Sequence, residues 1–190
     1  MKELRILVTG VGSLTAESII KSYKIVKERK IYIVGVDIKD FVPNEQIDKF
    51  YKILKPTENN YIDNLLDICK EEKIEFIVPL VDQELEILAE NKDIFLKNNI
   101  NICINNKEII QLIQNKYDLY KYLETNGIDV PKSIKFNNLN EFIGGCKQLD
   151  YAKNTICYKP LMSSGSRGFK IIKNDINYED YLVKNQIQNI

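Results

Sequence analysis

Short apolar runs alternate with amphipathic stretches along the first hundred residues of the chain. The pattern predicts helices after residue 13, over 60–72 and over 84–96, and strands over 4–9, 31–36, 50–53, 74–78 and 100–104. Continuous apolar strands separated by amphipathic helices are typical of a parallel sheet that helices cover on both faces. The sequence therefore predicts an open-sheet α/β fold for residues 1–105.

Periodicity within the predicted helices indicates which side chains face the core. In the first helix these are Ile19, Tyr23 and Val26. In the helix over 60–72 they are Ile62, Leu65, Leu66 and Cys69. We expect these side chains to pack the helices against the sheet.

The pattern changes after Asn105. We expect helices over 106–114, 117–125 and 139–149 (the last interrupted by Gly144 and Gly145), strands over 133–136, 155–159 and 169–172, and a final helix over 178–187. A sheet of two strands is marginal on its own. We therefore expect residues 106–190 to form a second, truncated unit, and the chain to be the N-terminal part of a longer protein.

Composition and charge exclude several classes of protein. The 190 residues contain 27 Lys and Arg and 27 Asp and Glu, a balance that indicates neither a nucleic-acid surface nor a basic membrane-binding face. No apolar run approaches the roughly 18 residues that span a bilayer. The start enters a strand directly, without room for a signal peptide. We expect a cytoplasmic protein without nucleic-acid or membrane partners.

Histidine is absent from the sequence, which excludes His-based triads, general bases and metal ligands. The four cysteines are far apart and form no CxxC pair, so their spacing argues against a zinc site. We expect all four to be buried, reduced thiols. They are Cys69, Cys103, Cys146 and Cys157. Any chemistry here must depend on Lys, Arg, carboxylates, hydroxyls and backbone amides.

A glycine turn links the first strand to the first helix. Gly10, Gly12 and Ser13 follow the strand, and Asp37 ends the next strand, as in a dinucleotide-binding fingerprint. Thr15 stands where the fingerprint has its third glycine. Three interpretations stay open: an NAD-type pyrophosphate site, a substrate site, or a tight structural turn.

Two acidic residues follow the strand over 74–78. Asp82 and Glu84 come after Pro79, at the edge of an open sheet where ligands bind. They would bind an amine or help to hold an acceptor substrate. The alternative is helix capping, with Asp82 as the N-cap and Glu84 in the first turn.

The segment over 158–170 has the features of an anion-binding loop. Lys159 ends a strand, and a loop that carries Arg167 follows it. Small residues let the backbone approach a ligand, and successive N–H groups form a concavity that suits anions. The small residues are Ser163, Ser164, Gly165, Ser166 and Gly168. Lys116, at the start of a predicted helix, is unfavourably placed with respect to the helix dipole, and an anionic ligand would explain its position.

Four motifs together resemble the ATP-grasp superfamily, in particular the carbamoyl-phosphate-synthase-like ligases. Each motif is weak alone, but their order and spacing span residues 6–172. The first is VTGVGS at 8–13, and the second is PLVDQEL at 79–85. The third combines NK at 115–116, Leu123, GI at 127–128 and PK at 131–132. The fourth combines KP at 159–160 with SSGSRG at 163–168.

The resemblance implies a fold and a site. It implies a Rossmann-like pre-ATP-grasp domain over 1–105 and a truncated first ATP-grasp subdomain over 106–190. Lys116 and Lys159 are similar to the lysines that contact the phosphates of ATP, and residues 163–168 to the mobile loop that closes on them. The magnesium ligands of the family would lie beyond residue 190, so we expect no metal site in this sequence.

The function implied is ATP-dependent activation of a carboxylate, or of bicarbonate, as an acyl phosphate that an amine attacks. Arg167 would act on the triphosphate during catalysis, and a homodimer is possible within this resemblance. We expect the 190 residues alone to be inactive. Two alternatives are an NAD(P)-binding oxidoreductase domain, based on Gly10, Gly12 and Asp37, and a non-catalytic nucleotide-binding module.

Overall fold

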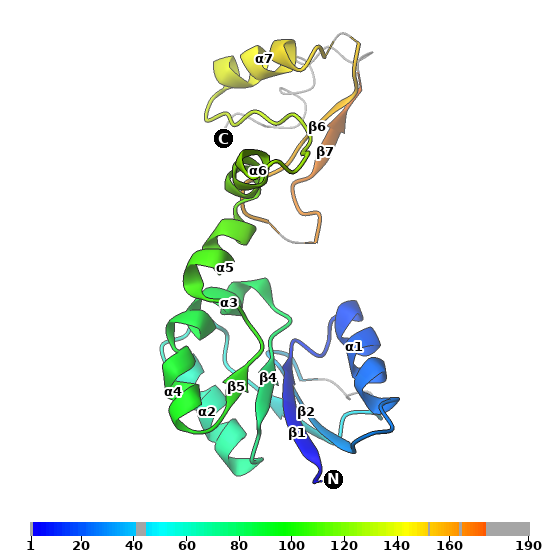
Figure 1. Ribbon diagram of the computed structural model, residues 1–190, viewed down its shortest axis with the longest axis vertical. Coiled ribbons are helices and arrows are strands. Elements are labelled where there is room, and N and C mark those ends of the chain that lie inside the picture. The colour runs from blue at the N-terminus through cyan, green and yellow to red at the C-terminus, as the bar shows by residue number, and fades with distance from the viewer. Residues whose placement is uncertain (1, 41–44, 152, 164, 174–190) are drawn as a thin grey trace. The chain divides into compact units, whose positions relative to one another are not determined.

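The computed structural model describes the chain except residues 1, 41–44, 152, 164 and 174–190. The chain forms two compact units, Met1–Ile110 and Gln111–Ile190, and each is described by itself (Figure 1). The sequence placed the division after residue 105, a few residues earlier. The assignment of the second unit as an ATP-grasp subdomain stays a prediction.

The first unit contains a five-stranded sheet in the order β3-β2-β1-β4-β5, and every neighbouring pair is parallel. From β1 the chain adds β2 and β3 on one side, and then β4 and β5 on the other. The predicted open parallel α/β fold is therefore confirmed. The strands are β1 (Leu4–Thr9), β2 (Ile31–Asp37), β3 (Lys49–Lys52), β4 (Phe76–Val78) and β5 (Asn101–Ile102).

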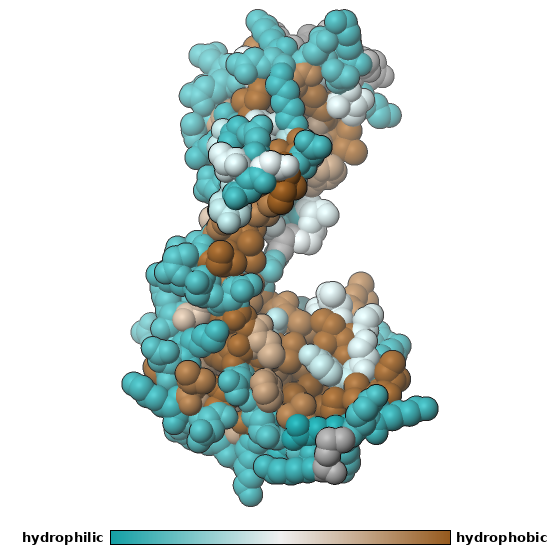
Figure 2. Space-filling model, in the orientation of Figure 1, coloured by the Kyte–Doolittle hydropathy of each residue, from teal (hydrophilic) through white to brown (hydrophobic). Residues whose placement is uncertain are grey.

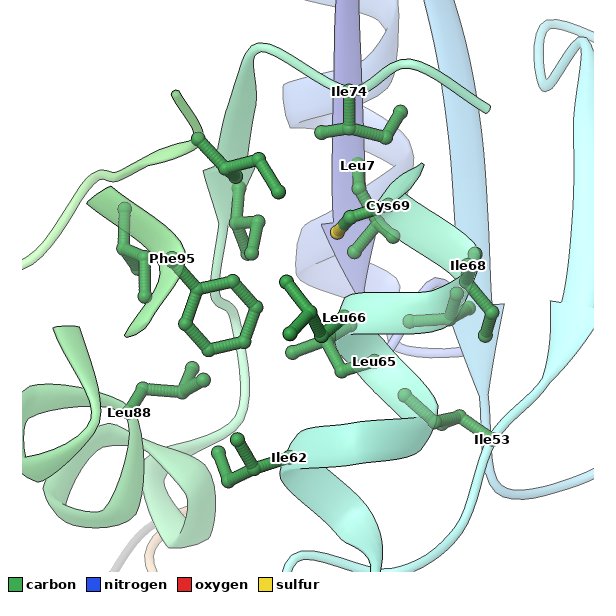
Figure 3. Close-up of a cluster of buried hydrophobic side chains, with 14 of the residues drawn as sticks. Leu7, Ile53, Ile62, Leu65, Leu66, Ile68, Cys69, Ile74, Leu88 and Phe95 are labelled. Carbon is green, nitrogen blue, oxygen red and sulfur yellow. The ribbon is translucent and has the colours of Figure 1, made fainter. Parts of the chain in front are cut away.

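Helices cover both faces of this sheet because alternate side chains of each strand point to opposite faces. Ile6 and Val8 of β1 pack with α1, whereas Leu7 belongs to the core on the side of the other helices (Figure 3). The two fully buried aromatic side chains in that larger core are Tyr61 and Phe95. The helices are α1 (Leu14–Lys24), α2 (Tyr61–Glu71), α3 (Asp82–Glu90) and α4 (Lys92–Lys97).

The predicted inward face of α2 is confirmed, since Ile62, Leu65, Leu66 and Cys69 are all buried. The prediction for α1 was partly wrong. Its buried residues are Ala16 and Ile20, Ile19 and Tyr23 are half-buried, and Val26 lies beyond the helix with 39% of its surface exposed. The buried face thus begins one turn earlier than the sequence indicated, on a small alanine.

The stretch over 84–96 forms two helices instead of one. Asn91 ends α3, and its side-chain Nδ2 donates to the Ile87 carbonyl at 2.8 Å. An asparagine side chain that competes for a helical carbonyl favours a break at that point. The expected long helix is therefore corrected to α3 and α4.

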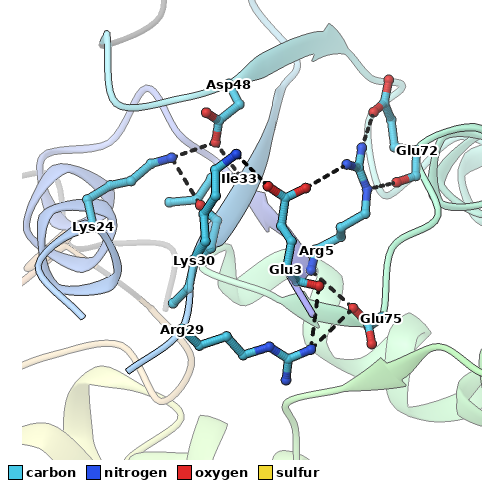
Figure 4. Close-up of polar contacts among 10 residues, drawn as sticks. Glu3, Arg5, Lys24, Arg29, Lys30, Ile33, Asp48, Glu72 and Glu75 are labelled. Atoms are coloured by element: carbon cyan, nitrogen blue, oxygen red, sulfur yellow. Dashed lines mark hydrogen bonds and ion pairs between the residues drawn. The ribbon is translucent and has the colours of Figure 1, made fainter. Parts of the chain in front are cut away.

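Cationic side chains near the start of β1 are paired with carboxylates (Figure 4). Arg5 donates to the Glu72 carboxylate at 2.9 Å, and its guanidinium lies 3.8 Å from the centre of the Tyr32 ring. Lys24 pairs with Asp48 at 2.5 Å. These pairs neutralise the cations and tie β1 to the end of α2 and α1 to the start of β3.

The second unit packs one helix against a two-stranded antiparallel sheet. Its elements are α6 (Lys116–Thr125), α7 (Leu139–Gln148), β6 (Ile156–Tyr158) and β7 (Lys170–Ile172), and α5 (Lys107–Gln114) runs across the division between the units. Its core consists of Phe142, Cys146, Tyr151 and Ile172, with Phe136, Ile156 and Tyr158 packed against them.

Three elements expected in this unit differ from the structure or lie outside the described residues. The predicted strand over 133–136 is irregular, and there Phe136 packs against Phe142 with ring centres 4.9 Å apart. Side-chain packing, and not sheet pairing, orders that segment. Gly144 and Gly145 lie inside α7 without interrupting it. The helix expected over 178–187 lies outside the described residues.

The cysteines divide into two pairs. Cys69 and Cys146 are buried, and burial raises the pKa of these thiols to about 12 and about 11. Cys103 and Cys157 are exposed, so the prediction of four buried thiols was wrong. Cys157 lies between two residues of β6 that face the core, and alternation turns it outward.

Within the described part of the chain, no helix combines the length and the apolar character needed to cross a membrane. On the face of the first unit seen in Figure 2, hydrophobic and neutral residues gather over the sheet and hydrophilic residues form the rim. Much of the hydrophilic surface on this face therefore lies at its edge.

Candidate functional site

The glycine turn of the first unit is shaped by its own packing. Gly10 has a φ of +58°, and a Cβ there would lie 2.6 Å from Cγ2 of Val81. Only glycine meets both conditions without strain. Ser13 caps α1, since its Oγ accepts from the Ala16 amide at 3.3 Å. These contacts support a structural turn, and a substrate role for Gly10, Gly12 and Ser13 stays a prediction.

The aspartate that ends β2 is bound to the same turn. The Gly12 amide donates to Asp37 Oδ2 at 3.0 Å, and the Lys39 amide donates to Asp37 Oδ1 at 3.0 Å. In dinucleotide-binding folds an acidic residue at this place accepts from a ribose hydroxyl. Here each carboxylate oxygen accepts one hydrogen bond from the protein backbone, so Asp37 braces the glycine turn.

Glu84 is enclosed at the carboxyl end of β1 and β4, with 2% of its surface exposed. Its carboxylate accepts from the Thr9 and Tyr61 hydroxyls and from the Val81 amide. The Thr9 hydroxyl in turn accepts from the Leu80 amide at 2.9 Å. Burial raises the pKa of Glu84, because desolvation outweighs these hydrogen bonds. The arrangement is that of a structural carboxylate.

Asp82 lies differently. It is the first residue of α3, while Val81, in extended conformation, occupies the N-cap position. The prediction of Asp82 as N-cap was therefore wrong by one residue, because the Glu84 carboxylate reaches back to the Val81 amide at 3.2 Å. Asp82 is exposed, and its role toward a substrate remains a prediction.

In the second unit, Lys116 is the first residue of α6. Asn115 caps this helix, with Oδ1 accepting from the amides of Tyr117 and Asp118. The Lys116 amide donates to the Leu161 carbonyl at 3.0 Å. Its ammonium donates to the Ser163 carbonyl at 2.7 Å and to the Ser163 hydroxyl at 3.2 Å. The predicted anion-binding lysine therefore lies against the predicted anion-binding loop.

Lys159 directly follows β6 and approaches the same helix. Its ammonium donates to the Tyr120 hydroxyl at 2.9 Å and lies 5.0 Å from the centre of that ring. Lys116 and Tyr120 are four residues apart on α6, so they share one face of the helix. The two lysines that the sequence singled out, 43 positions apart, thus border one cavity.

This cavity has a volume of about 380 Å³ and lies entirely within the second unit. Its walls combine aromatic and aliphatic side chains, among them Phe136, Phe142 and Leu161. Its described lining includes four lysines and neither aspartate nor glutamate. The lysines are Lys116, Lys132, Lys135 and Lys159. An apolar chamber with ammonium groups suits a ligand that has both a flat apolar part and negative charge.

The loop after Lys159 is held close to the strand. Gly168 has a φ of +74°, and a Cβ there would lie 2.7 Å from Cγ of Pro160, so this position requires glycine. Gly165 and Ser166 also have positive φ. Arg167 is exposed, and the described lining of the cavity does not include it. Ser164 lies outside the described residues, and its contribution to the loop stays a prediction.

A magnesium ion would need several oxygen ligands. In the ranges that the structure describes, no group of three or more Cys, Asp or Glu residues comes together in a way that could hold a metal ion. Apart from the Asn154 amide and the thiols of Cys146 and Cys157, the polar groups of the cavity lining are ammonium, hydroxyl and backbone groups, and the described lining has no carboxylate to hold a divalent cation. The described residues therefore do not fit Mg²⁺.

Sequence reasoning did not identify Tyr120 or the aromatic wall of the cavity. The spacing of Tyr120 four residues after Lys116 would have placed it on the same side of the helix as Lys116, which lines the cavity. Nothing in the sequence indicated that Phe136 and Phe142, from an irregular segment and a helix, would meet.

Comparison with known proteins bears on both units. The family model described as "PylC-like, N-terminal domain" matches residues 6–103. The formate-dependent phosphoribosylglycinamide formyltransferase of Prochlorococcus marinus (strain AS9601) is 27% identical over 175 residues, which cover 90% of this chain and 41% of that protein. The chain thus spans well under half the length of this relative.

Two solved structures show the same fold at low identity. Biotin carboxylase from Campylobacter jejuni, solved as a complex with β-γ-ATP, has a TM-score of 0.61 and 19% identity, covering 97% of this chain and 41% of that one. N5-carboxyaminoimidazole ribonucleotide synthetase from Thermus thermophilus has a TM-score of 0.58 and 10% identity, covering 93% and 43%.

These matches confirm the resemblance to the ATP-grasp superfamily and lend no support to an oxidoreductase. The family match begins in β1 and ends just after β5, so it takes in the whole parallel sheet of the first unit. Because it covers more than half of the sequence, the chain belongs to the family of PylC-like N-terminal domains.

Proposed function

We propose that this chain supplies the nucleotide-phosphate site of an ATP-dependent ligase. The ligase would phosphorylate a small carboxylate, or bicarbonate, and an amine or similar nucleophile would then displace the phosphate. Lys116 and Lys159 would hold phosphate oxygens of ATP, and the loop over 163–168, with Arg167, would close over them.

The observation that carries the proposal is the pair of lysines at the cavity. Among the described residues, their ammonium groups donate to two carbonyls and two hydroxyls, all of them neutral. No carboxylate of the described residues therefore pairs with these two lysines, whereas Lys24 and Arg5 in the first unit have carboxylate partners. An anionic ligand would supply the missing countercharge.

The chemistry fits a site without histidine. Transfer of a phosphoryl group depends on positioning and on neutralisation of negative charge more than on a protein base. Lysines and loop amides would supply part of that neutralisation. Mg²⁺ would supply more when bound, with ligands from outside the described residues.

Relatives support the class of substrate. A formate-dependent transformylase is related over 90% of this chain, and formate is a small carboxylate. We infer from this that the acceptor here is also a small carboxylate or bicarbonate, used by a protein of the cytoplasm.

The test is ATP-dependent release of ADP by the product of the complete reading frame, measured with panels of small carboxylates and amines. Lys116→Met and Lys159→Met should each lower the rate at least about tenfold, the effect of losing one hydrogen bond to a charged group in the reaction.

Lys153→Met is the matched control. Lys153 lies in the same unit, and its ammonium pairs with Asp150 at 3.0 Å on the surface. This variant should keep the rate of the unmodified protein. If every carboxylate fails to stimulate ADP release, or if Lys159→Met behaves like Lys153→Met, the proposed function is wrong.

A further inference from the structure

Tyr120 contacts the Lys159 ammonium, and the proposed role of Lys159 in holding phosphate oxygens does not explain this contact. The hydroxyl oxygen accepts from the ammonium at 2.9 Å, and the ring lies within range of a cation–π attraction, with 5.0 Å from its centre to the nitrogen. Two attractions therefore act on one ammonium group. A lysine side chain on a flexible four-carbon stem is restricted to one region by such a pair of contacts.

The tyrosine hydroxyl also keeps a proton to donate. Its oxygen is the acceptor toward Lys159, so its own O–H must point to another group. Among the described residues that proton has no acceptor, and Tyr120 lines the cavity. A hydroxyl that accepts from a cation is polarised and becomes a stronger donor.

We propose that Tyr120 positions the Lys159 ammonium at the cavity and donates its own hydroxyl proton to the same anion. The inference rests on the proposed nucleotide site and extends it by one residue. Tyr120 and Lys159 would then act as a paired donor, one charged and one neutral, toward a phosphate group.

The placement of Tyr120 on α6 strengthens the proposal. Lys116 is one helical turn earlier and contacts the loop at Ser163, while Tyr120 contacts Lys159 just after β6. One face of α6 thus contacts both the residue that follows β6, Lys159, and the loop residue Ser163. Pre-ordering of both lysines lowers the entropy that a ligand must overcome on binding.

The experiment measures binding of three probes to the chain by calorimetry: ATP, inorganic tripolyphosphate and adenosine. Tyr120→Phe keeps the ring and removes the hydroxyl. We expect about a three- to tenfold loss of affinity for ATP and tripolyphosphate, the worth of one hydrogen bond, and no change for adenosine. Tyr120→Leu, which also removes the ring, should lose more affinity for the two anions.

Tyr122→Phe is the matched control, since Tyr122 lies on the same helix, is 51% exposed and is outside the described cavity lining. It should bind all three probes like the unmodified chain. A double-mutant cycle with Lys159→Met tests the coupling between the two residues. In the Lys159→Met background, Tyr120→Phe should lower the affinity for the anions by less than it does in the unmodified chain.

The outcomes separate the two proposals. If the unmodified chain binds tripolyphosphate and ATP but Tyr120→Phe binds them equally well, the role of Tyr120 is wrong and the nucleotide site stands. Equal losses for adenosine and tripolyphosphate would mean a structural role and would also overturn the inference. If the unmodified chain binds neither anion, the nucleotide site in this chain is wrong, and the role of Tyr120 falls with it.

Discussion

Each unit contains side-chain charge that no opposite charge faces among the described residues, but the two cases differ. In the first unit it is the Glu84 carboxylate, which hydroxyls and an amide surround. In the second it is the ammonium groups of Lys116 and Lys159, which carbonyls and hydroxyls surround. Glu84 is 2% exposed, whereas both lysines border a cavity of about 380 Å³.

The comparison shows that an unpaired charge indicates a ligand site only where a ligand has room. Parallel sheets often bind ligands where the chain reverses its direction of strand addition, which here is between β1 and β4. Thr9, Glu84 and Leu80 occupy that position with mutual hydrogen bonds. At that position the Glu84 carboxylate is enclosed by protein donors and leaves no exposed charge for a ligand.

The largest expected effect comes from Glu84→Leu. This change leaves the Thr9 and Tyr61 hydroxyls and the Val81 amide without their shared acceptor, and each buried unsatisfied group costs about 1–3 kcal/mol. We expect the first unit to lose roughly 3 kcal/mol or more of its unfolding free energy. Hydrogen exchange in peptides from β1 and β4 measures this unit alone, and unchanged protection would contradict a structural Glu84.

The second largest effect should be that of salt, which distinguishes the exposed charge of the two lysines from the buried Glu84 carboxylate. Ions screen an exposed attraction much more than a buried one. Raising the salt concentration from about 0.05 to 0.5 M should weaken ATP binding several-fold, because the lysines are accessible. The same change should leave the relative stability of Glu84→Leu unaltered. Calorimetric ATP affinity that is independent of salt would argue against direct ammonium–phosphate contacts.

A smaller effect should follow from pH. The pKa of Glu84 is raised in the folded protein, so folding favours the protonated form. That stabilisation is complete below the ordinary glutamate pKa of about 4.3 and is lost as pH rises through the raised value. The unmodified chain should therefore lose stability relative to Glu84→Gln as the pH rises from about 4.3 through the raised pKa of Glu84. Urea unfolding at several pH values measures this, and a constant difference would be the contrary result.

The smallest expected effect is on stability in Lys159→Met. The variant loses a hydrogen bond to Tyr120 but no ion pair, and a partly exposed site of this kind usually changes stability by less than about 0.5 kcal/mol. Thermal unfolding should therefore be nearly unchanged even though nucleotide binding is weakened. A large drop in melting temperature would make Lys159 a structural residue like Glu84.

The sequence was sufficient for the sheet and for two lysines that line one cavity, and the role of these lysines toward a nucleotide stays a prediction. The sequence located all five strands of the first unit, and the clearest are β1 and β2, because strands covered on both faces need continuous apolar side chains. The small residues beside Lys159 indicated its loop, and Gly168 indeed requires glycine. These features depend on local sequence alone.

What the sequence could not provide depends on contacts between distant residues. The burial of Glu84 follows from Thr9 and Tyr61, which lie 75 and 23 positions away. Asp82 and Glu84 had therefore looked equivalent, although one is exposed and the other enclosed. The hydrogen bond between Tyr120 and Lys159 likewise joins residues 39 positions apart.

The first residue of α6 has a mechanical consequence. Lys116 is bound to the segment after β6 by its amide, at Leu161, and by its ammonium, at Ser163, while Tyr120 holds Lys159. Three points of attachment between a helix and a strand end resist sliding and rotation together. We therefore expect a displacement of the loop to carry the first turn of α6 with it, so that the two ammonium groups move together.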